Sequence, residues 1–85
     1  MKNLKEIKKI IMENKKTLIE TYGIKEIGIF GSFSRNEQNE FSDIDILVSL
    51  KNDYKTFDNY MNLKEFLESI LNIKVDLVTV DALKP

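Results

Sequence analysis

The sequence predicts an α+β fold, a small mixed three-stranded sheet with helices packed on it, and three observations support this prediction. Segments of strand length that are rich in apolar residues occupy residues 24–30, 43–50 and 73–80. Segments with helical periodicity occupy residues 2–22 and 57–71. The gap between the first two strands allows an antiparallel return, whereas the helix between the second and third favours a parallel, right-handed crossover. We therefore expect strand order 1-2-3, with strands 1 and 2 antiparallel and strands 2 and 3 parallel.

Length and composition indicate one small globular domain over residues 1–85. A chain of this size buries only about 60 to 65% of its unfolded surface, so we expect a thin stability margin. The composition, 42% hydrophobic and 32% charged, contains no long polar or Gly/Ser tract, which is typical of a chain that folds.

Charge and missing residue types exclude several function classes. A net charge of −1 gives no long-range electrostatic attraction for the negatively charged nucleic-acid backbone. Autonomous nucleic-acid binding is therefore not expected. The absence of Cys excludes disulfides, thiolate metal sites and cysteine nucleophiles, and the absence of His nearly excludes zinc, so any metal would be bound by oxygen. The charged N-terminus and the lack of a run of about 20 apolar residues predict a soluble, cytoplasmic protein with no membrane partner.

Apolar side chains at helical spacing define the two helical segments. The first segment carries a stripe of Leu4, Ile7, Ile11 and Leu18, flanked by Ile10 and Tyr22. The second carries a stripe, interrupted only by Lys64, of Phe57, Tyr60, Met61, Leu67, Ile70 and Leu71. Gly23 is expected to end the first helix in a left-handed conformation. Gly28, inside the first strand, indicates a bulge or close packing.

Two acids at the start of the second strand conflict with its apolar character. Asp43 and Asp45 are two residues apart, so on a strand they share a face. Asp is depleted in strands, and two carboxylates about 4 Å apart repel by roughly 4 kcal/mol at an effective dielectric near 20. The pattern therefore predicts a cation at this point. The alternative is a solvated turn end in which Ser42 and Asp43 cap backbone amides.

Further polar residues are expected at the same end of the sheet. Gly31 permits a tight turn after the first strand, and the amides that follow, with the Ser32 hydroxyl, form an anion site suited to a triphosphate, or an ordinary N-cap. Arg35 adds a cation there or is simply exposed to solvent. Asp76 lies near the start of the third strand, level with the other two acids if strands 2 and 3 are parallel, and on its own would pair with Lys74 or solvent.

These residues form a recognisable pattern. Three segments, Gly31-Ser32-Phe33-Ser34-Arg35, Asp43-Ile44-Asp45 and the later 74–78, with ten residues between Ser32 and Asp43, resemble the signature of the DNA polymerase beta-like nucleotidyltransferase superfamily. Within it the chain is most similar to the minimal nucleotidyltransferases, which often act as antitoxins beside a HEPN-domain toxin. The sequence departs from the family pattern at Ser34 and Asn36, where the family commonly has Ala and Gly.

The resemblance implies a polymerase beta-like nucleotidyltransferase core and a set of site residues. Asp43, Asp45 and Asp76 would be the catalytic and metal-binding residues, holding two Mg²⁺ ions, and Gly31, Ser32 and Arg35 would bind the nucleotide. The protein would transfer AMP from ATP to a hydroxyl side chain of a HEPN-type toxin, with tyrosine as the expected acceptor. Minimal nucleotidyltransferases usually continue beyond the position of Pro85, which leaves open whether a final C-terminal helix is missing.

Other functions remain open at this point. The chain could transfer a nucleotide to a small molecule such as an aminoglycoside. It could instead be a non-catalytic antitoxin that binds and occludes its toxin, with idle acids, or an unrelated α/β domain. Against an idle site, a cluster of acids without a metal costs stability in a small domain.

Overall fold

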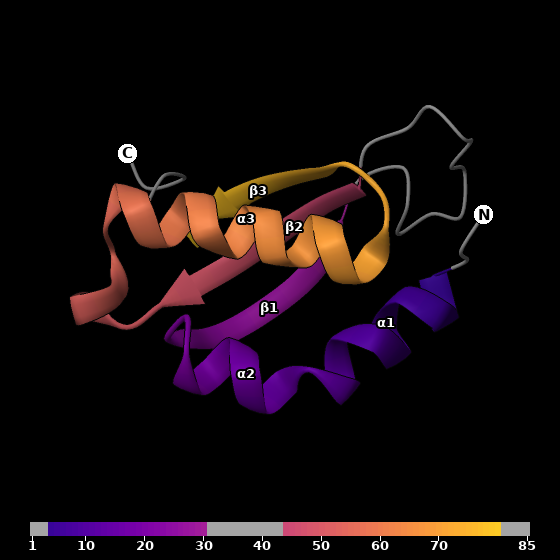
Figure 1. The fold of residues 1–85 in the computed structure, drawn as a ribbon, viewed down its shortest axis with the longest axis horizontal. Helices are drawn as coiled ribbons and strands as arrows, with labels where there is room; N and C mark the ends of the chain where they lie inside the picture. Colours follow the sequence, from indigo (N-terminus) through magenta and orange to yellow (C-terminus); the bar gives the residue numbers. More distant parts are fainter. Residues whose placement is uncertain (1–3, 31–43, 81–85) are drawn as a thin grey trace.

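The computed structural model describes residues 4–30 and 44–80. Two short helices, α1 (Leu4–Glu13) and α2 (Lys15–Glu20), precede the antiparallel strands β1 (Ile24–Phe30) and β2 (Ile44–Leu50). A 3-10 turn at Asn52–Tyr54 leads into α3 (Phe57–Leu71), which is followed by β3 (Val75–Thr79) (Figure 1). None of the described helices is long and apolar enough to span a membrane.

The sheet has the predicted order and strand directions. Its order is β1-β2-β3, with β1 antiparallel to β2 and β2 parallel to β3. The register pairs Phe30 with Asp45 across the first two strands and Asp45 with Asp76 across the second two. The predicted mixed sheet is therefore confirmed, and the start of β2 lies level with both neighbouring strands.

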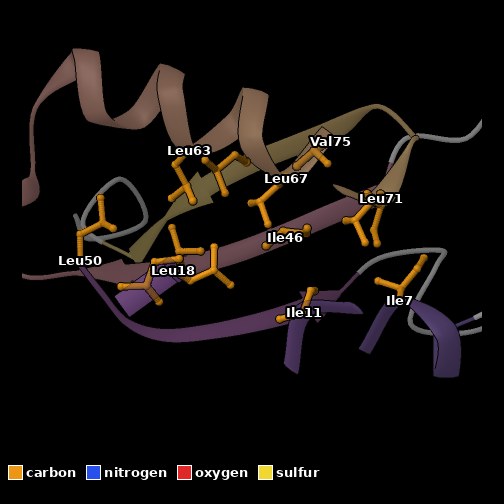
Figure 2. Close-up of a cluster of buried hydrophobic side chains, with 13 residues drawn as sticks. Ile7, Ile11, Leu18, Ile46, Leu50, Leu63, Leu67, Leu71 and Val75 are labelled. Atoms are coloured by element: carbon orange, nitrogen blue, oxygen red, sulfur yellow. The ribbon is translucent and has the colours of Figure 1, made fainter. Parts of the chain in front are cut away.

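One face of the sheet carries the hydrophobic core. Burial alternates along β2, where every second residue from Ile44 to Leu50 is buried, because side chains of a strand point alternately to its two faces. Figure 2 shows Leu63 and Leu67 of α3 directed toward the sheet. The core consists of Ile7, Ile11, Leu18, Ile24, Ile44, Ile46, Val48, Leu50, Leu63, Leu67, Leu71, Val75 and Leu77. Among the described residues no polar or charged side chain is buried.

The N-terminal helix differs from the continuous helix predicted over residues 2–22. It is interrupted at Asn14, whose side-chain Nδ2 donates to the carbonyl of Ile10 at 2.8 Å and whose backbone has ψ 12°. Asn side chains compete with the helical hydrogen-bond ladder in this way. The second helix ends at Glu20 with Thr21 as its C-cap, three residues before Gly23, which does take the predicted left-handed conformation with φ 67°.

The predicted apolar stripe of α3 is partly wrong. The buried residues are Leu63, Leu67 and Leu71, spaced by four, whereas Phe57 is 76% exposed. Phe57 precedes Leu63 by six residues. At 3.6 residues per turn, the two side chains are therefore separated by a rotation of about 240° about the helix axis. The sequence interpretation therefore joined residues from two different faces and omitted Leu63.

The expectation of a bulge or close packing at Gly28 is also wrong. The register of β1 shifts between Ile24 and Glu26, away from the glycine. Among the described residues, a Cβ atom added at Gly28 would have no heavy atom within 4 Å. Gly28 is exposed and pairs with Leu47, on the face opposite the core.

Candidate active site

The fold brings two of the predicted acids together. Asp45 of β2 and Asp76 of β3 are direct register partners, and adjacent strands lie about 4.8 Å apart. Their neighbours Ile44, Ile46, Val75 and Leu77 are buried in the core. Because successive side chains alternate between faces, both carboxylates lie on the face opposite the core. Asp45 is half-buried and Asp76 is exposed.

The first strand ends at the same point. Its last residue, Phe30, pairs with Asp45 and directly precedes Gly31 in the chain. The other predicted site residues, Gly31, Ser32, Arg35 and Asp43, lie outside the described residues. Their roles in catalysis, metal binding and nucleotide binding stay predictions, as do those of Asp45 and Asp76.

Backbone hydrogen bonds hold the start of β3 beside the start of β2. The amide of Ile44 donates to the carbonyl of Lys74 at 3.0 Å, immediately before the paired acids. The amide of Val75 donates to the Glu68 carboxylate Oε2 at 2.9 Å, which ties β3 to the last turns of α3. Sequence reasoning missed Glu68, because no local pattern distinguishes it from the other exposed or half-exposed acids of this helix.

The paired carboxylates suit a hard cation. Two charges about 5 Å apart repel by about 3 kcal/mol at an effective dielectric near 20, and the exposure of Asp76 reduces this value through screening. Carboxylate oxygens are the ligands that Mg²⁺ prefers, so Asp45 and Asp76 fit such an ion chemically. Within residues 4–30 and 44–80 there is no cluster of three or more metal-ligating side chains, and the predicted third acid, Asp43, lies outside them.

A hollow of about 440 Å³ lies at the opposite end of the sheet. Its lining includes Ser49 near the end of β2, Tyr60 of α3, Thr79 at the end of β3 and Val80, which follows β3. Tyr60 is held there because its hydroxyl donates to the carbonyl of Leu77 at 2.6 Å. Since Asp45 and Asp76 lie at the N-terminal ends of the two parallel strands, this hollow is separate from the acidic site.

The fold is that of a minimal nucleotidyltransferase. A solved structure provisionally described as a minimal nucleotidyltransferase superimposes with a TM-score of 0.74 at 30% identity, covering 93% of this chain and 82% of that one. A crystal structure of the toxin–antitoxin pair MntA–HpeT, with two Asp-to-Glu substitutions two positions apart, matches with a TM-score of 0.66 at 29% identity, covering 98% of this chain and 61% of that one.

The chain belongs to the nucleotidyltransferase domain family, whose model matches residues 4–85. Protein adenylyltransferase MntA of Thermococcus cleftensis is 43% identical over 84 residues, covering 99% of this chain and 84% of the relative. A Methanocaldococcus jannaschii protein that carries the provisional name protein adenylyltransferase is 51% identical over 85 residues, covering 98% and 95%. The chain is therefore a nucleotidyltransferase, and membership of this family implies a nucleoside triphosphate substrate and a divalent metal in general.

Proposed function

We propose that this protein is a Mg²⁺-dependent protein adenylyltransferase that acts as an antitoxin. It transfers AMP from ATP to a hydroxyl side chain, with tyrosine as the expected acceptor, on a HEPN-type toxin. The observation that carries the proposal is the pairing of Asp45 with Asp76 in a chain 43 to 51% identical to proteins named for protein adenylyltransferase activity. The match to a toxin–antitoxin structure supports a toxin as the partner.

The three acids and the Gly-Ser turn have distinct roles in this proposal. Asp43, Asp45 and Asp76 hold two Mg²⁺ ions, which neutralise charge on the triphosphate when bound. Gly31, Ser32 and Arg35 bind the phosphates. Asp43 and Asp45 have the same spacing as the two aspartates substituted in the toxin–antitoxin structure, which supports a role for both.

The chemistry is an in-line displacement at phosphorus. The acceptor hydroxyl oxygen forms a bond to the α-phosphorus of ATP, and the bond from that phosphorus to the bridging oxygen of the β-phosphate breaks. Pyrophosphate leaves with the bonding electrons, and the hydroxyl proton passes to a carboxylate oxygen of Asp76. Because Asp76 is exposed, a side chain of another protein can reach it. Positioning and charge neutralisation supply most of the rate enhancement in such reactions.

The test uses the toxin encoded beside this protein, Mg²⁺ and ATP labelled at the α-phosphate. The native protein is expected to transfer label to the toxin, and ATP labelled at the γ-phosphate is expected to transfer none. Asp45→Asn and Asp76→Asn should each lower the rate by at least about a hundredfold. Asp58→Asn, which removes an exposed acid from the first turn of α3, is the matched control and should retain the native rate. Absence of transfer by the native protein, or equal transfer by all variants, would contradict the proposal.

A further inference from the structure

The turn between α3 and β3 is organised by one residue, Glu68. Its backbone carbonyl accepts from the amide of Asn72 at 2.8 Å, and Asn72 ends the helix in the left-handed conformation with φ 55°. Its side-chain carboxylate accepts from the amide of Val75 at 2.9 Å. A short turn joins α3 to β3 (Figure 1), and Glu68 contacts both the end of the helix and the first residue of the strand.

The bond to Val75 lies on the outer edge of the sheet. The carbonyl of Lys74 faces β2, since it accepts from Ile44, and backbone polar groups of successive strand residues point in opposite directions. The amide of Val75 thus points away from β2, where β3 is an edge strand of the described sheet. The Glu68 carboxylate supplies this amide with a charge-assisted acceptor, which is stronger than a neutral one.

This anchor lies next to the paired acids. Val75 directly precedes Asp76, and its register partner Ile44 directly precedes Asp45. A shift of β3 by one residue would turn Asp76 toward the core and Val75 away from it. The position of the Asp76 carboxylate relative to Asp45 therefore depends on how firmly the first residue of β3 is held.

We propose that Glu68 is a positioning residue of the active site. Its carboxylate fixes the start of β3, so that Asp76 stays level with Asp45 and the pair binds a divalent cation tightly. The inference rests on the proposed function in one respect, namely that Asp45 and Asp76 bind the metal. Glu68 itself touches neither substrate nor metal in this scheme, and acts through Val75 and Asp76.

Three substitutions separate the hydrogen bond from the charge. Glu68→Ala removes the acceptor, and Glu68→Asp keeps the charge but shortens the side chain by one methylene, so it should no longer reach Val75. Glu68→Gln keeps an acceptor oxygen at the same reach and loses the charge. Glu65→Ala, which removes an exposed acid one turn earlier on α3, is the matched control.

The first measurement is Mn²⁺ binding by electron paramagnetic resonance, with no nucleotide or toxin present. Glu68→Ala and Glu68→Asp are expected to weaken Mn²⁺ affinity by about tenfold or more, as residues that orient metal ligands typically do. Glu68→Gln and Glu65→Ala should bind like the native protein. The second measurement is amide hydrogen exchange, in which Val75 should exchange faster in Glu68→Asp while Ile46 and Val48 stay protected.

The third measurement is the Mg²⁺ dependence of adenylyl transfer. Glu68→Asp should need more Mg²⁺ for half-maximal rate, with kcat near native once Mg²⁺ saturates, a pattern that a general loss of stability does not produce. Native Mn²⁺ affinity in Glu68→Asp together with fast exchange at Val75 would overturn the inference and leave the proposed function intact. Absence of Mn²⁺ binding by the native protein, or undiminished binding in Asp76→Asn, would overturn both.

Discussion

At the scale of single residues, Asp45 and Asp76 place two like charges next to each other on neighbouring strands. The two carboxylates are register partners on one face of the sheet, and like charges directly opposite each other on neighbouring strands are destabilising. A small domain has little stability to spare. In the proposed function a bound cation offsets this repulsion.

This repulsion predicts a gain in stability when one charge is removed. In EDTA at low salt, Asp76→Asn should raise the free energy of unfolding by about 0.5 kcal/mol, since Asp76 is exposed and the repulsion is screened. For a domain of this size that corresponds to about 2 to 4 °C in Tm. Thermal unfolding followed by circular dichroism measures the shift, with Asp53→Asn in the 3-10 turn as the control. A lower Tm for Asp76→Asn in EDTA would contradict the repulsion.

At the scale of elements, the apolar patterning of the strands predicted the sheet. Local hydrogen bonds of individual side chains account for features that the patterning did not predict. The expected runs 24–30, 43–50 and 73–80 correspond to β1, β2 and β3 within two residues at each end, because apolar runs of strand length between turns carry the signal. The helix break at Asn14 was not predictable from apolar spacing, since it arises from a side-chain hydrogen bond. Glu68 was missed for a related reason, as its partner Val75 is identified only by the turn geometry.

Gly23, which directly precedes β1, and Gly28, which lies within it, differ in how well an alanine would fit at their positions. This difference gives a matched pair of predictions. Gly23 has φ 67°, and an added Cβ would overlap the ring of Tyr54. Gly23→Ala should therefore lower the free energy of unfolding by about 2 kcal/mol or more, from left-handed strain and steric overlap. The added methyl of Gly28→Ala meets no described residue within 4 Å, and this substitution should raise the free energy of unfolding by up to about 1 kcal/mol, because Gly weakens a strand interior. Urea unfolding of both variants measures the difference, and equal effects would contradict the structure.

At the scale of the whole molecule, one core supports a candidate site on the opposite face. The 13 side chains that are buried among the described residues lie on the helical side of the sheet (Figure 2), and Asp76 is exposed on the other side. An acceptor on a second protein can therefore approach the acids without any rearrangement of the core. The exposed face would also allow the protein to neutralise a toxin by binding alone, without chemistry. Covalent modification and binding alone are therefore distinguished by the molar ratio of antitoxin to toxin that neutralisation needs.

Catalytic neutralisation predicts turnover. With Mg²⁺ and ATP present, the native protein should silence its toxin at a molar ratio far below one, because each molecule modifies many toxins in succession. The toxin should also stay inactive after the antitoxin is removed, since the phosphodiester bond to its hydroxyl persists. Asp76→Asn, which leaves the core untouched, should neutralise only at equimolar or higher ratios, through binding alone. Titration of toxin activity against each protein, with and without ATP, measures this; equimolar, ATP-independent neutralisation by both proteins would establish occlusion instead.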